Sequence, residues 1–309
     1  MVRFLHHRCP PSVLNITLEN DNGTITVDGK ETHEVSKGNH SVKLGPLFPG
    51  EYQVDFKTKF DYVGKEITES EPVSLLGMES ETDYSKMVTG DQVRINSPLG
   101  EVQAYVNDQP TPFVQRSYMD DSSGDYFYPA FSDGSQKIYG VAKFPWGESK
   151  SEPVVIDDLS DNYDITPPLQ EQTRKEVLDF VTLFLETRAE AYGSKDISEL
   201  EKLYPNFEGD LLQMVEADRE DMYYPWGSDN TLQSVKLQEF RFTGSEDPAD
   251  HVAVFYDREK KHFFVQVTGI HAFYALTISD GDVDDIDNDE LLNLNLVYTD
   301  GKWTVSKIF

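Results

Sequence analysis

The chain has 309 residues, of which 38% are hydrophobic, and a formal net charge of −29 at pH 7. This length favours two or three domains, and this hydrophobic content excludes a wholly disordered chain. A surface so acidic, with no basic stripe to offset it, excludes nucleic acid as an expected partner and repels anionic lipid.

The N-terminal segment "MVRFLHHRCP" has no apolar run long enough for a signal peptide or a membrane helix. Its Cys9 is the single cysteine of the chain, which excludes an internal disulfide. Together with His6 and His7 it supplies three zinc-type ligands, where a structural zinc site needs about four. We therefore expect a soluble chain without a cofactor, which reaches a membrane only through an upstream anchor absent from this sequence.

Two tandem segments then repeat one pattern of strands and turns. The matched pairs are "TITVDGKET" (24–32) with "QAYVNDQPT" (103–111), "LFPGEYQVDFKTKF" (47–60) with "AFSDGSQKIYGVAKF" (130–144), and "ESEPVSL" (69–75) with "KSEPVVI" (150–156). Apolar and polar residues alternate in the strands, and Gly-containing turns separate them. The repeat predicts two all-β, sandwich-like modules, over 14–77 and 93–157, joined by a linker over 78–92.

Helical spacing replaces this alternation after Pro167-Pro168. Apolar residues recur at positions i, i+3, i+4, i+7 and i+8 from Val177, and Arg188 follows at i+11. The pattern predicts an amphipathic helix that ends at Gly193. A second helix is predicted after Asp196 and a short third one after Asp210.

Five strands are predicted after these helices. They cover 231–244, 251–257, 262–277, 291–298 and 302–309. Gly269 lies in the middle of the longest strand, which favours a bulge that curves the sheet. Three helices followed by a curved antiparallel sheet are the order of an NTF2-like cone, so we predict an α+β NTF2-like domain over 168–309.

Three segments carry a family resemblance: "GPLFPGEYQV" (45–54), "FPWGESKSEPVVI" (144–156) and "DGKWTVSKI" (300–308). With the order of the domains, they make residues 14–309 resemble the extracytoplasmic region of TcaA-like proteins, the teicoplanin-resistance-associated membrane proteins of Gram-positive bacteria. Members of that family have a cytoplasmic zinc ribbon and one membrane helix before these domains, whereas this chain has neither. The resemblance implies a position on the extracytoplasmic face of the membrane and a cell-envelope role linked to wall metabolism and glycopeptide-antibiotic response, without catalysis.

Titratable residues of the predicted sheet are the candidates for chemistry in a cone pocket. Asp257, His262, His271 and Tyr274 have the right residue types for a base or a polar contact. No set of nucleophile, base and orienting group accompanies them, so we predict that the chain is not an enzyme. His271 and Tyr274 are kept as binding candidates.

Aromatic residues beside Gly or Pro turns form a second group of binding candidates. They are Trp146 in the second β-module, and Tyr223, Tyr224 and Trp226 after the third helix. Such side chains can stack on sugar rings, which suits cell-wall glycan as a partner. The alternative, which we favour, is that the tryptophans close a sheet end or the mouth of the cone.

The run "SDGDVDDIDNDE" near the C-terminus resembles a calcium loop. Asp280, Asp282 and Asp284 have the 1, 3, 5 spacing of an EF-hand. Asp285 replaces the required glycine, and Leu291 replaces the required bidentate glutamate. We predict a loop of the cone that binds a divalent cation weakly at most, through the three aspartates.

Three functional hypotheses follow. The leading one is a non-enzymatic extracytoplasmic module that binds wall polymer or an envelope protein. The second is an NTF2-like enzyme or small-ligand-binding protein that uses the cone pocket. The third is an architectural stalk whose C-terminal domain forms a homodimer.

Overall fold

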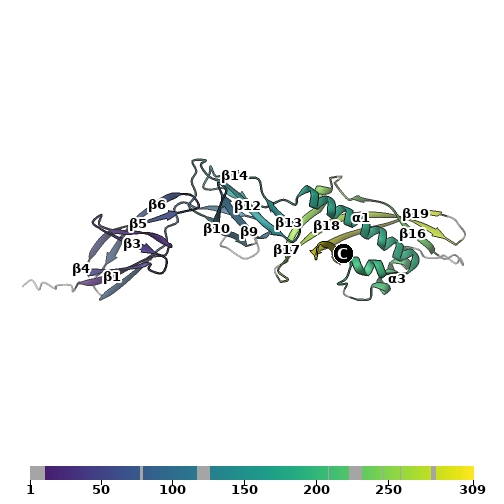
Figure 1. Ribbon diagram of the computed structural model, residues 1–309, viewed down its shortest axis with the longest axis horizontal. Helices are drawn as coiled ribbons and strands as arrows, with labels where there is room; N and C mark the ends of the chain where they lie inside the picture. Colours follow the sequence, from purple (N-terminus) through teal and green to yellow (C-terminus); the bar gives the residue numbers. More distant parts are fainter. Residues whose placement is uncertain are drawn as a thin grey trace, which may run out of the picture. The chain divides into compact units, whose positions relative to one another are not determined.

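The computed structural model describes residues 11–76, 79–116, 126–207, 209–222, 232–245, 247–257, 259–279 and 283–309. Figure 1 shows the strands and helices of the chain coloured along the sequence. The chain divides into two compact units. The first consists of Met1–Ser97, Gln103–Gly140 and Glu152–Ile165, and the second of Pro98–Val102, Val141–Ser151 and Thr166–Phe309. Within the described ranges, no helix has both the length and the apolar character that a membrane crossing requires.

The first β-module has seven strands in two sheets. They are β1 (Ser12–Leu18), β2 (Asn22–Val27), β3 (Glu31–Ser36), β4 (Ser41–Leu47), β5 (Gly50–Phe60), β6 (Lys65–Leu75) and β7 (Glu81–Lys86). One sheet has the order β3-β2-β5-β6 and the other the order β4-β1-β7. In the second sheet β1 is antiparallel to β4 and parallel to β7. Both sheets contribute to one core, since Ile16 of β1 and Phe56 of β5 are fully buried in the same cluster.

The second β-module repeats this topology. Its strands are β8 (Val93–Asn96), β9 (Gly100–Val106), β10 (Gln109–Arg116), β11 (Tyr126–Phe127), β12 (Lys137–Phe144), β13 (Gly147–Lys150), β14 (Val154–Val155) and β15 (Asn162–Asp164). The sheet orders are β10-β9-β12-β13, with β14 also on β12, and β11-β8-β15. Strand β8 is antiparallel to β11 and parallel to β15, as β1 is to β4 and β7. The sequence repeat is therefore also a repeat of strand order and pairing.

Strands β7 and β15 lie beyond the residues predicted for each module, 14–77 and 93–157. Strand β7 is formed by the stretch predicted to be a linker, and it completes the three-stranded sheet of the first module. The residues on the inward face of β7 are Thr82, Tyr84 and Lys86, of which only Tyr84 is largely apolar, and all three are only half-buried. This explains why the periodicity did not indicate a strand.

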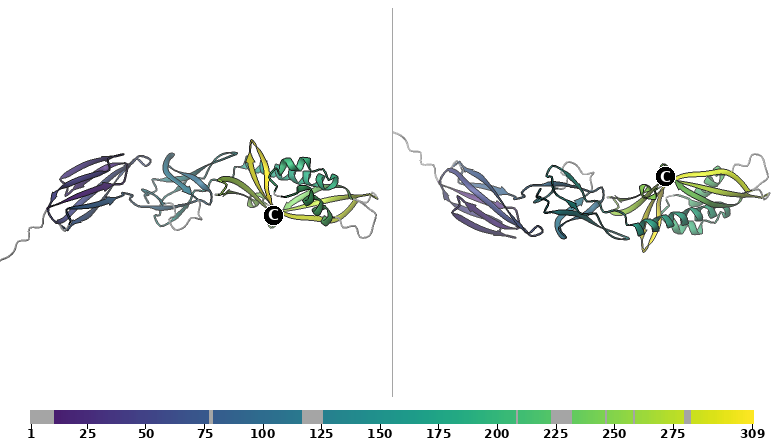
Figure 2. Two further views of the ribbon diagram at one scale, coloured as in Figure 1. Left: turned by 90° about the horizontal axis from the view of Figure 1, so that it is seen from below. Right: turned by 90° about the horizontal axis from the view of Figure 1, so that it is seen from above.

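The second unit contains an α+β domain. Its elements are α1 (Glu171–Ser194), α2 (Ser198–Leu203), α3 (Leu211–Met222), β16 (Leu232–Phe242), the 3-10 turn η1 (Pro248–His251), β17 (Val252–Asp257), β18 (His262–Ile278), β19 (Val283–Thr299) and β20 (Lys302–Ile308). The antiparallel sheet has the order β16-β18-β19-β20, and β17 pairs with β18. The helices, green in Figure 2, lie along one face of this sheet.

A bulge at Gly269 divides the long strand β18 into two halves, as the sequence predicts. Gly269 has φ +68°, and the pairing with β19 shifts between Val267 and Ile270. Before the bulge the odd-numbered residues are buried, and after it the even-numbered residues are buried. The buried face of the strand therefore changes from odd-numbered to even-numbered residues at Gly269.

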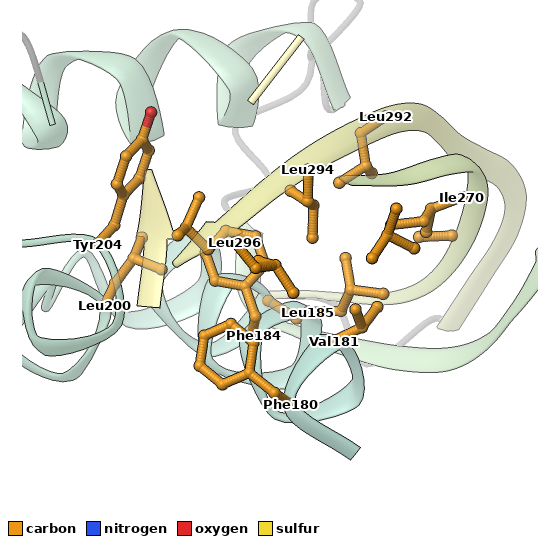
Figure 3. Packing of buried hydrophobic residues seen from close by; sticks show 14 of the residues in the cluster. Phe180, Val181, Phe184, Leu185, Leu200, Tyr204, Ile270, Leu292, Leu294 and Leu296 are labelled. Carbon is orange, nitrogen blue, oxygen red and sulfur yellow. The ribbon is translucent and has the colours of Figure 1, made fainter. Parts of the chain in front are cut away.

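The space between α1 and the sheet is filled by apolar side chains. Figure 3 shows residues of α1 meeting residues of β18 and β19. Phe184 and Leu185 of α1, and Leu294 and Leu296 of β19, are all fully buried. This core fixes the sheet on which the site described below is built.

Gly193 does not end α1, which corrects the sequence prediction. The helix continues to Ser194, and Lys195 takes the left-handed conformation that closes it, with φ 64°. A Cβ at Gly193 would lie 2.9 Å from the backbone nitrogen of Val235 in β16. Glycine is needed here because the helix backbone touches the strand backbone.

We expect Gly193→Ala to destabilise the second unit, although alanine is the better helix former by about 1 kcal/mol. The added methyl group must displace backbone atoms, which costs about 1–3 kcal/mol. Urea unfolding followed by tryptophan fluorescence measures this, because Trp146 and Trp303 belong to the second unit. Lys175→Ala, at an exposed position of the same helix, is the control and should change stability little. A gain of stability in Gly193→Ala would contradict the close contact.

Candidate functional site

A pocket of about 450 Å³ lies at one end of the sheet in the second unit, and we call it the end-of-sheet pocket. It is lined by Tyr204, Asn206 and Phe207 from the segment after α2, by Asp257, Lys260, His262 and Phe264 from the β17–β18 hairpin, and by Asn295, Ser306 and Lys307 from β19 and β20. About a hundred residues of sequence separate the first of these segments from the last, and the sheet brings them together. Charged, amide and aromatic side chains thus converge on one concavity.

The β17–β18 hairpin positions two of the residues that the sequence proposed for chemistry. Asp257 and His262 lie directly opposite each other in the register of the hairpin. The carboxylate of Asp257 accepts a hydrogen bond of 2.9 Å from the backbone nitrogen of Lys260. This bond, with the nearby imidazole of His262, lowers the pKa of Asp257. The carboxylate therefore stays ionised and holds the turn.

The other pocket residues are held to different degrees. The side-chain oxygen of Asn295 accepts a hydrogen bond from the Gln266 amide at 3.1 Å, and its backbone oxygen accepts one from the Ser306 hydroxyl at 3.0 Å. Phe264 stacks on Phe255, with ring centroids 5.5 Å apart. Lys307 is exposed, with its ammonium 5.4 Å from the ring centroid of Phe309. The pocket thus has a fixed polar and aromatic wall and a freer cation.

A second hollow, of about 660 Å³, lies between α1 and β16. Its charged residues are Glu186, Glu190 and Lys236, and the rest of its lining includes Gly193 and Ser194. It holds neither an imidazole nor an aromatic ring. The end-of-sheet pocket offers the wider range of chemistry, so we take it as the candidate functional site.

Behind the sheet, a buried charge cluster joins the helices to the strands. The guanidinium of Arg188 in α1 is only 3% exposed and contacts Asp218 of α3 at 2.8 Å and Glu290 of β19 at 2.8 Å. The hydroxyl of Tyr192 donates to Asp218 at 3.1 Å, and that of Tyr274 donates to Glu290 at 3.4 Å. Two carboxylates therefore share one guanidinium and two phenols.

Burial sets the protonation of this cluster. Burial raises the pKa of Glu290 and outweighs the lowering effect of the Arg188 charge, and the negative charge of Asp218 raises this pKa further. Burial also raises the pKa values of Tyr192 and Tyr274 well above their usual range, so both phenols remain donors. The cluster suits a structural lock better than proton transfer near neutral pH.

The two strand candidates His271 and Tyr274 lie on opposite faces of β18. Tyr274 is buried in the cluster just described, whereas His271 lies on the outer face. There His271 forms a close contact with the carboxylate of Asp289, which lowers the pKa of that carboxyl. The structure does not bring the two candidates together, and their role in binding stays a prediction.

Trp146 packs inside the second unit. Its ring lies 5.0 Å from that of Phe144, in a stacked arrangement, and 5.1 Å from that of Trp303. Trp303 is buried and belongs to the core under the helices. These contacts are those of the packing alternative, while a role in glycan binding stays a prediction. Tyr223, Tyr224 and Trp226 lie outside the described residues.

The acidic run is not the loop that the sequence predicts. Strand β19 begins at Val283, so residues 283–290 belong to the strand, and positions 283, 284 and 288–290 pair with β18. Glu290 points inward to Arg188, and Asp289 points outward. Asp280 and Asp282 lie outside the described residues, as does the side chain of Asp284. Among the side chains that are described, no group of three or more His, Cys, Asp or Glu could hold a metal ion.

The sequence reasoning missed the Arg188 cluster, although a signal was present. Arg188 continues the apolar face of α1 at position i+11 from Val177. A charged residue on the buried face of a helix requires an opposite charge across the core. Its acidic partners could not be named, because Asp218 and Glu290 come from elements far along the chain.

Comparisons with known proteins relate the chain to one family. Residues 89–167 match the family model described as the TcaA protein 3rd/4th domain. Over 214 residues the chain is 22% identical to the uncharacterized membrane protein YvbJ of Bacillus subtilis (strain 168). This alignment covers 67% of the chain and 33% of the relative, so the chain spans about a third of the length of the curated relative it matches.

The raised pKa of Glu290 gives a test of the charge cluster by pH. A carboxyl with a higher pKa in the folded than in the unfolded chain costs stability as the pH rises past its ordinary value of 4.5. We expect the unfolding free energy of the wild type to fall relative to that of Glu290→Gln as the pH rises above about 4.5. Glu186→Gln, at an exposed position of α1, should follow the wild type. A constant difference between Glu290→Gln and the wild type would refute the shift.

Packing of Trp146 gives a second test. We expect Trp146→Ala to lower the stability of the second unit by about 2 kcal/mol, since the ring is half-buried and leaves a cavity against Trp303. Urea unfolding followed by helical circular dichroism measures the loss. Phe309→Ala removes an aromatic ring that is 51% exposed and is the matched control. Equal stability of the two variants would favour a surface role for Trp146.

Proposed function

The chain is TcaA-like, and from this premise we propose that it forms the extracytoplasmic region of a cell-envelope protein. The membrane protein YvbJ as a relative supports this position. In this proposal the chain works by binding wall polymer or an envelope protein, without catalysis. A link to wall metabolism and to glycopeptide-antibiotic response is part of the same proposal, and it rests on the family resemblance.

The end-of-sheet pocket is the observation that carries the binding role. Its volume of about 450 Å³ lies within the range of about 300–1,000 Å³ of small-molecule sites. It is built on strands of a sheet, and its walls are held by hydrogen bonds within those strands. We further propose that the α+β domain is NTF2-like, because three helices cover one face of an antiparallel sheet that a bulge curves.

The state of Asp257 favours binding over catalysis. A general base works best when its pKa lies near the working pH. The pKa of Asp257 is lowered because the carboxylate accepts a hydrogen bond from the turn. One carboxylate oxygen of Asp257 accepts the hydrogen bond that holds the turn, and the lowered pKa makes Asp257 a weak base.

An enzyme is the second candidate, since Asp257 and His262 line the same pocket. In that case Asp257→Asn and His262→Gln would abolish turnover of a pocket ligand while its affinity changed little. In the binding proposal, no turnover of a bound ligand is expected from the wild type. Product analysis after incubation of wild-type protein with a bound ligand separates the two.

Retention on purified cell wall tests the proposed function. We expect the full chain to sediment with Gram-positive wall, and to do so more strongly when Mg²⁺ is present, because the net charge of −29 opposes contact with anionic polymer. Wall stripped of teichoic acid separates binding to that polymer from binding to peptidoglycan. Absence of retention on both kinds of wall would overturn wall binding and leave an envelope protein as the partner.

Light scattering on the purified chain tests the architectural alternative. A homodimer through the α+β domain would double the mass of 35.2 kDa. A monomer across the working concentration range would remove dimerisation from the proposal.

A further inference from the structure

We infer that the end-of-sheet pocket binds a sugar or polyol unit that carries an anionic group, either a carboxylate or a phosphate. The inference rests on the proposed binding function and names its class of ligand. Three features of the pocket carry it: two lysines without an ion pair in the described part of the chain, amide donors on two walls, and the rings of Phe207 and Phe264.

The pocket is locally cationic in a strongly acidic chain. The exposed side chains of Lys260, from the β17–β18 hairpin, and Lys307, from β20, both line it. Within the part of the chain that the structure describes, neither ammonium group forms an ion pair with a carboxylate. Among the other exposed lysines of this domain, Lys195 and Lys202 have carboxylate partners, whereas Lys261 and Lys302 have no ion pair in the described part of the chain. Two free cations at one concavity favour an anionic oxygen group, since charge-assisted hydrogen bonds are the stronger ones.

Asp257 is the carboxylate among the described residues that line the pocket, and although the charge of Lys260 acts on it, the two form no ion pair. Asp257 is engaged with the backbone of its own turn and faces His262 across the hairpin. Its charge therefore lies at the turn, while Lys307 comes from β20, on the other side of β19. Asn295 and Lys307 are paired between β19 and β20, so an anionic ligand bound at Lys307 would lie beside the amide of Asn295.

Amides and rings indicate that the anion is attached to a sugar or polyol. The side-chain oxygen of Asn295 is occupied by Gln266, so its amino group is left to donate. Asn206, exposed on another wall, adds a second amide. Phe207 and Phe264 supply half-buried ring surface against which the C–H face of a sugar can pack. Amides suit hydroxyl groups and rings suit the carbon skeleton, whereas a bare inorganic anion would need neither.

Titration of the full chain with matched small probes tests the inference. The probes are N-acetylmuramic acid, which carries a carboxylate, N-acetylglucosamine 1-phosphate, which carries a phosphate, and neutral N-acetylglucosamine. Isothermal titration gives the affinity, and NMR of the side-chain amides of Asn206 and Asn295 gives the location. We expect one anionic probe to bind at least tenfold more tightly than the neutral sugar, and the tighter of the two identifies the anionic group.

The chain offers a closely matched pair of variants. Lys260→Gln with Lys307→Gln removes both pocket cations, whereas Lys261→Gln with Lys302→Gln removes two exposed lysines from the same turn and the same strand that do not line the pocket. Both double variants change the net charge equally. We expect the first to weaken the anionic probe at least tenfold and the second to weaken it less than twofold.

Three results would overturn the inference: no binding of either anionic probe at millimolar concentration, equal affinity for the neutral sugar, or equal weakening by both double variants. The proposed function fails separately, by absence of retention on wall. If the wild type is retained on wall but binds no probe, the binding function stands and its ligand class is wrong. If probes bind but wall does not retain the chain, the pocket is right and wall polymer is not its source.

Discussion

The α+β domain depends on one buried guanidinium. Arg188 joins α1 to α3 through Asp218 and to β19 through Glu290. Taking this cation out of water is costly, and it is tolerated only because both carboxylates and the phenols beside them surround it. The cluster ties α1 to β19, the same strand that supplies Asn295 to the pocket. The close backbone contact at Gly193 attaches α1 to the sheet at a second point, on β16.

Local pattern was enough to predict most elements of the chain. The repeat in the first half predicted two β-modules, and their sheets have the same order and pairing. Helical spacing from Val177 predicted α1, and a lone glycine in a long strand predicted the bulge. The resemblance to TcaA-like proteins is confirmed by the match over 89–167. These features depend on near neighbours in the chain, which a sequence displays directly.

Features that depend on distant partners could not be predicted in the same way. A run of carboxylates predicts a solvated loop, yet residues 283–290 form a strand because β18 extends far enough to pair with them. Only the partner across the core distinguishes Glu290, which faces Arg188, from Asp289, which faces solvent. The candidate site also depends on distant partners. The sequence indicated Asp257 and His262 as single residues, but that they line one pocket with Lys307 follows only from the order of the strands in the sheet.

Because of the bulge at Gly269, the residues of β18 that face outward are even-numbered before the bulge and odd-numbered after it. Upstream of it, the outer face shows His262, Phe264 and Gln266, all even-numbered, and downstream it shows the odd-numbered His271 and Phe273. Deleting one residue at this point would keep the faces of the residues that line the pocket. It would reverse the faces of the residues after the bulge, so that Tyr274 would point outward and away from Glu290. Substitutions in the two ends of the strand are therefore constrained independently, at one end by the lining of the pocket and at the other by the buried charge cluster.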